Sequence, residues 1–142
     1  MEGYFIRSSR VTPSVYFNPK KELLDLRGRS NPENPLTFYN FLLTNLDNYS
    51  TLDAPKIIVN MAFEYFNTSS SKCLFLLLSK LNNINQQGKK VIVNWYHEED
   101  DEDMKESGED YSSFFDYEFN LIKVPVINAL GESGNKSSLT AA

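Results

Sequence analysis

Histidine and cysteine each occur only once in the 142 residues, and this scarcity excludes several kinds of site. Cys73 has no partner for a disulfide within the chain. A zinc site needs two or more His or Cys ligands, and an acyl-transfer site needs a base beside its nucleophile. His97 and Cys73 alone supply neither arrangement. We therefore expect no catalytic residue and no bound metal, so the protein should not be an enzyme.

Long apolar segments and an excess of basic residues are also missing. The block from Cys73 to Leu78 is only six residues long, whereas a membrane helix needs roughly 18 apolar residues. The start of the chain, MEGYFIRSSR, has no basic stretch followed by an apolar core and no cleavage site. We expect a cytoplasmic protein that does not insert into membranes. Lys and Arg number 14 against 19 Asp and Glu, and this net charge of -5 argues against a nucleic-acid-binding surface.

Two segments resemble ligand sites without meeting their requirements. GESGNKSS, residues 131–138, has the composition of a phosphate-binding loop, but Asn135 interrupts the Gly-Lys-Ser/Thr motif and no helix can follow before the sequence ends. We expect no cofactor. The acidic run from Glu98 to Glu106 lacks the spacing of a calcium loop. It is either a solvated helix start, favoured by the helix dipole, or an acidic docking surface for a basic partner.

Hydrophobic periodicity predicts an α/β fold. Alternation over residues 14–29 predicts a hairpin, and residues 54–66, 89–98 and 119–126 read as further strands. Helical spacing predicts helices that begin at Pro35, near Thr68 and near Asp100. The order is ββαβαβαβ, which implies a mixed sheet of four to five strands with helices packed against it. We expect one domain over residues 1–126 and a flexible tail over residues 127–142.

The same periodicity assigns side chains to faces. The first helix should have Asn34 as its N-cap and should bury one apolar face. The strand after it should turn its odd-numbered residues one way and its even-numbered residues, including Glu64, the other. The second helix should bury a leucine face and end at Gly88. The predicted faces are Phe38, Phe41, Leu42, Leu46 and Tyr49; Ile57, Val59, Met61, Phe63 and Tyr65; and Leu74, Leu77, Leu78, Leu81 and Ile84.

Four hydroxyl residues, Thr68 to Ser71, stand between that strand and the second helix. Capping explains one or two of them, with Asn67 or Thr68 accepting from the amides of the next turn. A helix N-terminus also presents free N–H groups and partial positive charge, which would accommodate a phosphate carried by Thr68 or a neighbouring serine. Both interpretations, structural capping and a regulated phosphosite, are open on this evidence.

Three longer motifs carry a resemblance to a known family. LRGRSNPEN, EYFNTSSSK and VNWYHEEDDEDMKESGEDY are similar to segments of the SiaC family of bacterial regulatory phosphoproteins, and the resemblance spans about residues 10–123. It implies a fold like the STAS domain of anti-sigma factor antagonists. It also implies that a serine/threonine kinase of the anti-sigma type phosphorylates Thr68 and that a PP2C-type phosphatase removes the phosphate. The unmodified form would bind and activate a diguanylate cyclase, in c-di-GMP signalling and biofilm regulation.

The alternative is a binding module with a different output partner, either like an anti-sigma factor antagonist or a constitutive scaffold. In either case we expect the partner surface to include the helix start at Thr68. Glu64 would sharpen the repulsion of a phosphate for an acidic partner, and Lys72 would offset part of it. Arg27 and Arg29 either bind partner carboxylates or phosphates or are solvated residues at the end of an edge strand. The remaining candidates for contact are Asn67, Ser69, Ser70 and Ser71.

Overall fold

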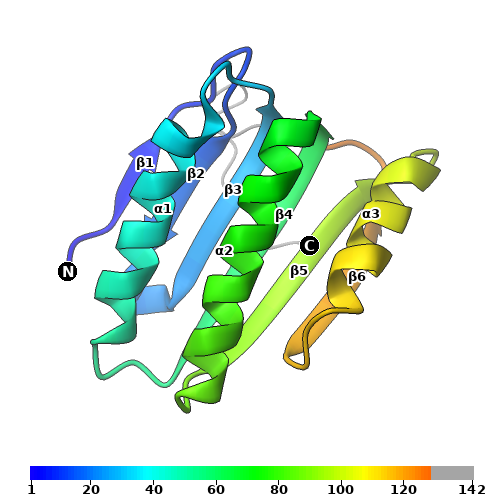
Figure 1. Cartoon of the computed structure of the whole chain (residues 1–142). Helices are drawn as coiled ribbons and strands as arrows, with labels where there is room; N and C mark the ends of the chain where they lie inside the picture. Colours follow the sequence, from blue (N-terminus) through cyan, green and yellow to red (C-terminus); the bar gives the residue numbers. More distant parts are fainter. Residues whose placement is uncertain (129–142) are drawn as a thin grey trace.

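A six-stranded sheet with three helices forms the structure, a computed structural model that describes residues 1–128 (Figure 1). The strands are β1 (Tyr4–Ile6), β2 (Ser14–Asn18), β3 (Leu23–Ser30), β4 (Lys56–Phe66), β5 (Lys90–Glu98) and β6 (Glu118–Val124). The helices are α1 (Pro35–Ser50), α2 (Thr68–Gln86) and α3 (Glu102–Ser112), with a short 3-10 helix η1 (Pro19–Lys21) between β2 and β3. The glycine-rich segment 131–138 and most of the predicted tail lie outside the described residues.

The predicted α/β class and mixed sheet are confirmed, but the number of strands is larger by at least one. Neighbouring strands follow the chain order from β1 to β6; the first three are antiparallel and the last four are parallel. The strand that the sequence did not predict is β1. It has only three residues and two of them are exposed, so its alternation is too short to detect. The element order is therefore βββαβαβαβ.

All three helices cover the same face of the sheet (Figure 1). Each of them connects two adjacent parallel strands, and successive connections run in the same direction across the sheet. Because such crossovers are right-handed, each helix arrives on the same side. The predicted leucine face of α2 lies in the core, with Leu74, Leu77, Leu78 and Leu81 fully buried and Ile84 2% exposed. Gly88 follows α2 with φ +107°, as predicted for a left-handed residue at a helix end.

The buried face of α1 differs by one position from the prediction. Tyr39 is fully buried and its hydroxyl hydrogen-bonds with Ser30 Oγ at 2.7 Å. Phe41, expected in the core, is 46% exposed and instead lies edge-on against Tyr4. Periodicity cannot distinguish the two aromatic residues, because either can lie at the border of a helical face. The buried hydroxyl partner on β3 makes Tyr39 the inward one.

A β-bulge at Glu64 reverses the predicted alternation at the end of β4. Gly28 pairs with Phe63, whereas the next residue, Arg29, pairs with Tyr65, so β4 contains one extra residue. After the bulge, Tyr65 is 44% exposed, and Phe66 turns to the helix-covered face to contact Phe63. The prediction that Tyr65 shares the face of Phe63 was therefore wrong. The bulge matters for function because Phe66 immediately precedes the hydroxyl run.

The helix-free face of the sheet carries polar side chains. Asn60 accepts from Asn94, and Asn94 accepts from Asn120, so three adjacent strands are linked by side-chain amides. Ile127 packs on this face against Ala62 and Tyr96 and is 1% exposed. The packed part of the chain therefore extends past the predicted boundary at residue 126. No helix within residues 1–128 has both the length and the apolar character required to cross a bilayer.

Candidate functional site

The start of α2 lies directly after β4, at the carboxyl end of the parallel strands. Asn67 caps the helix: its Oδ1 accepts from the backbone N–H of Ser70 at 2.8 Å. Its own backbone N–H donates to the carbonyl of Ser30 on β3, so the cap is tied to the sheet. Asn67, and not Thr68, is therefore the capping residue. The Thr68 hydroxyl therefore does not cap α2.

The four hydroxyl residues have different environments. Ser70 is fully buried and accepts from the Ser30 hydroxyl at 2.9 Å, so it joins β3 to α2. The Ser71 hydroxyl donates to the carbonyl of Thr68 at 2.6 Å. Thr68 and Ser69 are exposed. The surplus of hydroxyls thus divides into one buried structural serine, one partly buried serine within the first turn, and two residues that solvent can reach.

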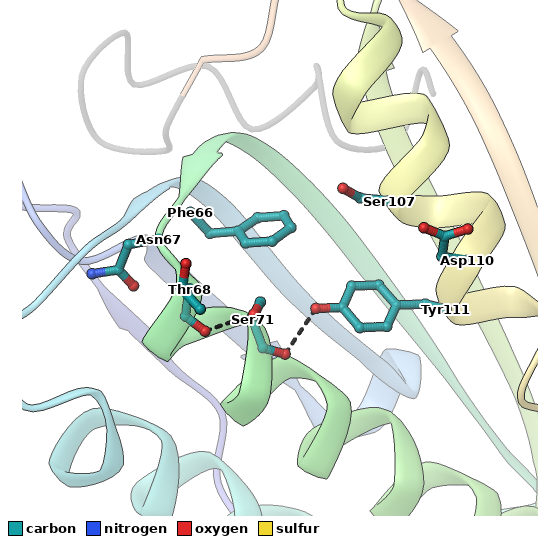
Figure 2. A pocket seen from close by; sticks show the side chains of 7 residues that line it. All are labelled: Phe66, Asn67, Thr68, Ser71, Ser107, Asp110 and Tyr111. Carbon is teal, nitrogen blue, oxygen red and sulfur yellow. Dashed lines mark hydrogen bonds between the residues drawn. The ribbon is translucent and has the colours of Figure 1, made fainter.

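Thr68 lies at the edge of a groove of about 380 Å³ between α2 and α3. Figure 2 shows Ser107, Asp110 and Tyr111 on α3, across the groove from the start of α2, with the Tyr111 side chain reaching toward α2. Tyr111 spans it, because its hydroxyl donates to the backbone carbonyl of Ser71 at 2.8 Å. The seven lining side chains are Phe66, Asn67, Thr68, Ser71, Ser107, Asp110 and Tyr111.

The electrostatics of the groove have one charged contributor among those seven side chains, the Asp110 carboxylate. Burial raises the pKa of Tyr111 to about 12, so its hydroxyl keeps its proton and donates at neutral pH. The backbone N–H groups at the start of α2 add a partial positive charge on the opposite wall of the groove. The groove is therefore lined by hydroxyl groups, two aromatic rings and the Asn67 amide, with one carboxylate on the α3 side.

The position of α3 is fixed by contacts with β5. Asp101 caps the helix, with Oδ1 accepting from the Met104 N–H at 3.0 Å, as expected for an acidic helix start. The indole N–H of Trp95 donates to the Met104 carbonyl. Gly108 allows the close approach, because a Cβ there would lie 2.5 Å from Trp95 Cδ1. These contacts hold Tyr111 beside the start of α2.

A model of the SiaC family regulatory phosphoproteins matches residues 6–124.

The chain belongs to the SiaC family. The resemblance of its motifs to that family is confirmed, and the chain is a regulatory protein rather than an enzyme. A curated relative, an uncharacterized protein of Pseudomonas aeruginosa strain UCBPP-PA14, is 22% identical over 121 residues, which cover 85% of this chain and 96% of the relative.

Solved structures of the family share the fold. SiaC of Pseudomonas aeruginosa superposes with a TM-score of 0.81 at 20% identity, covering 87% of this chain and 100% of that one. A second structure contains the diguanylate cyclase SiaD in complex with its activator SiaC from the same organism. It matches with a TM-score of 0.81 at 21% identity over 85% of this chain and 99% of the other.

The remaining predicted contact residues are distributed over both sides of the site. Lys72 and Glu64 are exposed, on α2 and at the bulge of β4. Arg29 is exposed at the end of β3, with its guanidinium 5.2 Å from the centre of the Tyr65 ring. Arg27 is only 4% exposed and lies on the helix-free face, with Nε 3.7 Å from Asp25 Oδ1. It is neither a solvated residue nor part of the Thr68 surface, so the hypothesis of a partner contact at Arg27 is withdrawn.

Sequence reasoning missed the α3 wall of the groove. Ser107, Asp110 and Tyr111 lie in the third family motif, just after the acidic run, but the sequence does not predict that they line a groove with Thr68. A local signal was present: Met104, Gly108 and Tyr111 are spaced as one helical face, which indicates an inward side with room for close packing. His97 and Cys73, both 4% exposed, lie outside the groove lining. Residues 1–128 contain no cluster of three or more His, Cys, Asp or Glu suited to a metal ion.

Proposed function

We propose that this protein is a phosphorylation-controlled activator of a diguanylate cyclase and that Thr68 carries the phosphate. A serine/threonine kinase of the anti-sigma type adds the phosphate, and a PP2C-type phosphatase removes it. The unmodified form binds and activates the cyclase in the cytoplasm, which links the protein to c-di-GMP signalling and biofilm regulation.

The observation that carries the proposal is the exposure of Thr68 at the first position of α2. A kinase must reach the hydroxyl that it modifies. Ser70, which is fully buried and hydrogen-bonded to Ser30, does not satisfy this requirement. Thr68 satisfies it. Because Asn67 caps the helix, the Thr68 side chain lies at the groove and is not needed as the cap. Membership in a family of regulatory phosphoproteins supports a modified residue at such a position.

A phosphate on Thr68 would change the surface in two ways. It would add about -1.5 to -2 charge and three acceptor oxygens at the mouth of the groove. It would also fill space that a closely packed partner needs. Thr68, Ser69 and Lys72 are exposed on the first turns of α2 and would form the centre of the contact surface. Arg29 and Glu64, at the ends of β3 and β4, would form its border.

The choice of a cyclase as partner rests on the solved complex of SiaC with the diguanylate cyclase SiaD. This chain shares its fold with SiaC over 85% of its length. The alternatives from sequence, an antagonist of an anti-sigma factor or a constitutive scaffold, have no comparable support.

The kinase assay that tests the site compares two matched variants, Thr68→Ala and Ser69→Ala. Both residues are exposed and adjacent, so both substitutions should leave the fold intact. Incubation with the cognate kinase and ATP, followed by phosphopeptide mass spectrometry of residues 67–72, should show phosphate on wild type and on Ser69→Ala. Stoichiometric phosphorylation of Thr68→Ala would refute the assignment of the site.

The output is tested by the rate of c-di-GMP synthesis. The diguanylate cyclase encoded nearest to this gene in its native genome is mixed with wild type, with kinase-phosphorylated wild type or with Thr68→Ala treated identically. We expect activation by wild type and by treated Thr68→Ala, and loss of activation on phosphorylation of wild type. Equal activation by all three proteins would indicate a constitutive scaffold.

A further inference from the structure

We propose that α3 senses the state of Thr68, because the Asp110 carboxylate opposes a phosphate on Thr68 across the groove and the opposition loosens α3 from the start of α2. This inference rests on the proposed function and names the element through which the modification acts. Asp110 acts as a positioning residue: it changes the relation between two helices and takes no part in chemistry.

The two groups line opposite sides of one groove. Thr68 on α2 and Asp110 on α3 line the same groove of about 380 Å³ (Figure 2). Beside Asp110, Tyr111 donates its hydroxyl to the Ser71 carbonyl at 2.8 Å. This bond is a side-chain link between α3 and the first turn of α2. A force that moves Asp110 away from Thr68 therefore acts one residue from the link.

The side chains of the groove do not match a phosphate, and the favourable contribution comes from the partial positive charge at the start of α2. A site that holds a phosphate supplies Lys, Arg or several backbone N–H groups. Here the lining offers hydroxyl groups, an amide and one carboxylate, and its side chains include no cation. The backbone N–H of Ser70, at the helix start, is already bound by the Asn67 cap. Like charges on the two walls of the groove repel each other, and solvent screens part of this repulsion because Thr68 and Asp110 are both exposed.

The other charged groups at this end of the domain lie outside the lining of the groove. Lys72 follows on the exposed side of α2, and Arg29 and Glu64 are exposed at the ends of β3 and β4. Tyr111, the other titratable group of the lining, stays neutral because its pKa is about 12. Asp110 is therefore the lining residue whose charge opposes a phosphate on Thr68.

The consequence is a change in the α2–α3 surface. In the unmodified protein, the Tyr111 hydrogen bond joins α3 to α2, and the contact of the Tyr111 ring with Phe66, 6.5 Å between centres, joins α3 to the end of β4. With a phosphate on Thr68, repulsion from Asp110 weakens this contact, and α3 exchanges its amide protons faster. A partner that binds across both helices then loses part of its surface in addition to meeting a new charge.

The test installs phosphothreonine at position 68 during translation by genetic code expansion, so it does not depend on any kinase. Three backgrounds are compared: wild type, Asp110→Asn and Glu109→Gln. Glu109 is the matched control, because it is an adjacent exposed carboxylate of α3 that does not line the groove. Two measurements are made on each: the second pKa of the phosphate by ³¹P NMR, and hydrogen exchange of the α3 amides with and without the phosphate.

We expect the phosphate pKa to be higher, by about 0.3 or more, in wild type than in Asp110→Asn, because a nearby carboxylate disfavours the dianion. Phosphate should speed α3 exchange about threefold or more in wild type and in Glu109→Gln, and clearly less in Asp110→Asn. Three results would each overturn the inference. The phosphate pKa could be the same in Asp110→Asn as in wild type, or Glu109→Gln could lower it as much as Asp110→Asn does. The exchange rate of the α3 amides could also be unchanged by the phosphate. None of these results would bear on whether a kinase modifies Thr68 in the cell.

Discussion

Replacement of Asp25 by asparagine should change how the stability of the domain depends on pH. Asp25 is fully buried on β3, and neither carboxylate oxygen has a hydrogen-bond donor at good geometry. Burial raises its pKa from 3.8 to about 7, against the lowering effects of the Arg27 charge and of Asn60 opposite it on β4. The folded state therefore binds this proton more tightly than the unfolded state does.

The sign and size follow from linkage. Each pKa unit corresponds to about 1.4 kcal/mol, so the difference between 3.8 and about 7 corresponds to about 4 kcal/mol. The free energy of unfolding carries no penalty from Asp25 below about pH 4, where the group is protonated in both states. The penalty grows as the pH rises, by at most about 1.4 kcal/mol per pH unit, and is complete above about pH 7. Asparagine cannot ionise and avoids it.

Urea unfolding at several values between pH 4 and pH 8 measures the effect, with the fluorescence of the buried Trp95 as the probe. The stability of Asp25→Asn relative to wild type should increase by about 4 kcal/mol across this range. Other carboxylates affect both proteins equally and cancel in the difference. Asp53→Asn, at an exposed position, shows the effect of losing a surface carboxylate. A difference between Asp25→Asn and wild type that stays constant with pH would refute the reasoning.

Three further substitutions test the architecture of the site. Asn67→Ala removes the α2 cap and should lower the free energy of unfolding by about 1 kcal/mol in urea; an unchanged value would show that another group caps the helix. Gly108→Ala places a Cβ 2.5 Å from Trp95 and should lower the melting temperature, since overpacking costs about 1 to 3 kcal/mol; a rise would mean that α3 adjusts freely. Tyr111→Phe removes the bond to the Ser71 carbonyl and should cost about 1 kcal/mol and speed hydrogen exchange in α3; unaltered exchange would contradict its role as a link.

Local patterns predicted most elements of the fold. The leucines of α2 recur at helical spacing, and the helix is amphipathic in the structure as predicted. Asp101 caps α3, and Gly88 follows the end of α2 in a left-handed conformation. These features depend on neighbours within one or two turns along the chain. For this reason they could be inferred without knowing what each element packs against.

Other features depend on partners far along the chain. The bulge at Glu64 exists only relative to the register of β3, and it sends Phe66 toward the helices. Ser70 is buried because Ser30, forty residues earlier, donates to it. The run of four hydroxyl residues could not by itself reveal which of its members was structural. Each assignment required knowledge of a residue on another strand or helix.

The sequence by itself determined the α/β class, the helix starts, the buried face of α2 and the choice of Thr68 as the candidate site. Periodicity, capping and family motifs are properties of contiguous residues, so they can be inferred from the sequence alone. Only the tertiary structure decided that Arg27 is buried on the helix-free face and that Asp110 and Tyr111 line the same groove as Thr68. The physical reason is that packing of α3 on β5 places it beside α2, and the Gly108–Trp95 contact that fixes this packing joins separate parts of the chain.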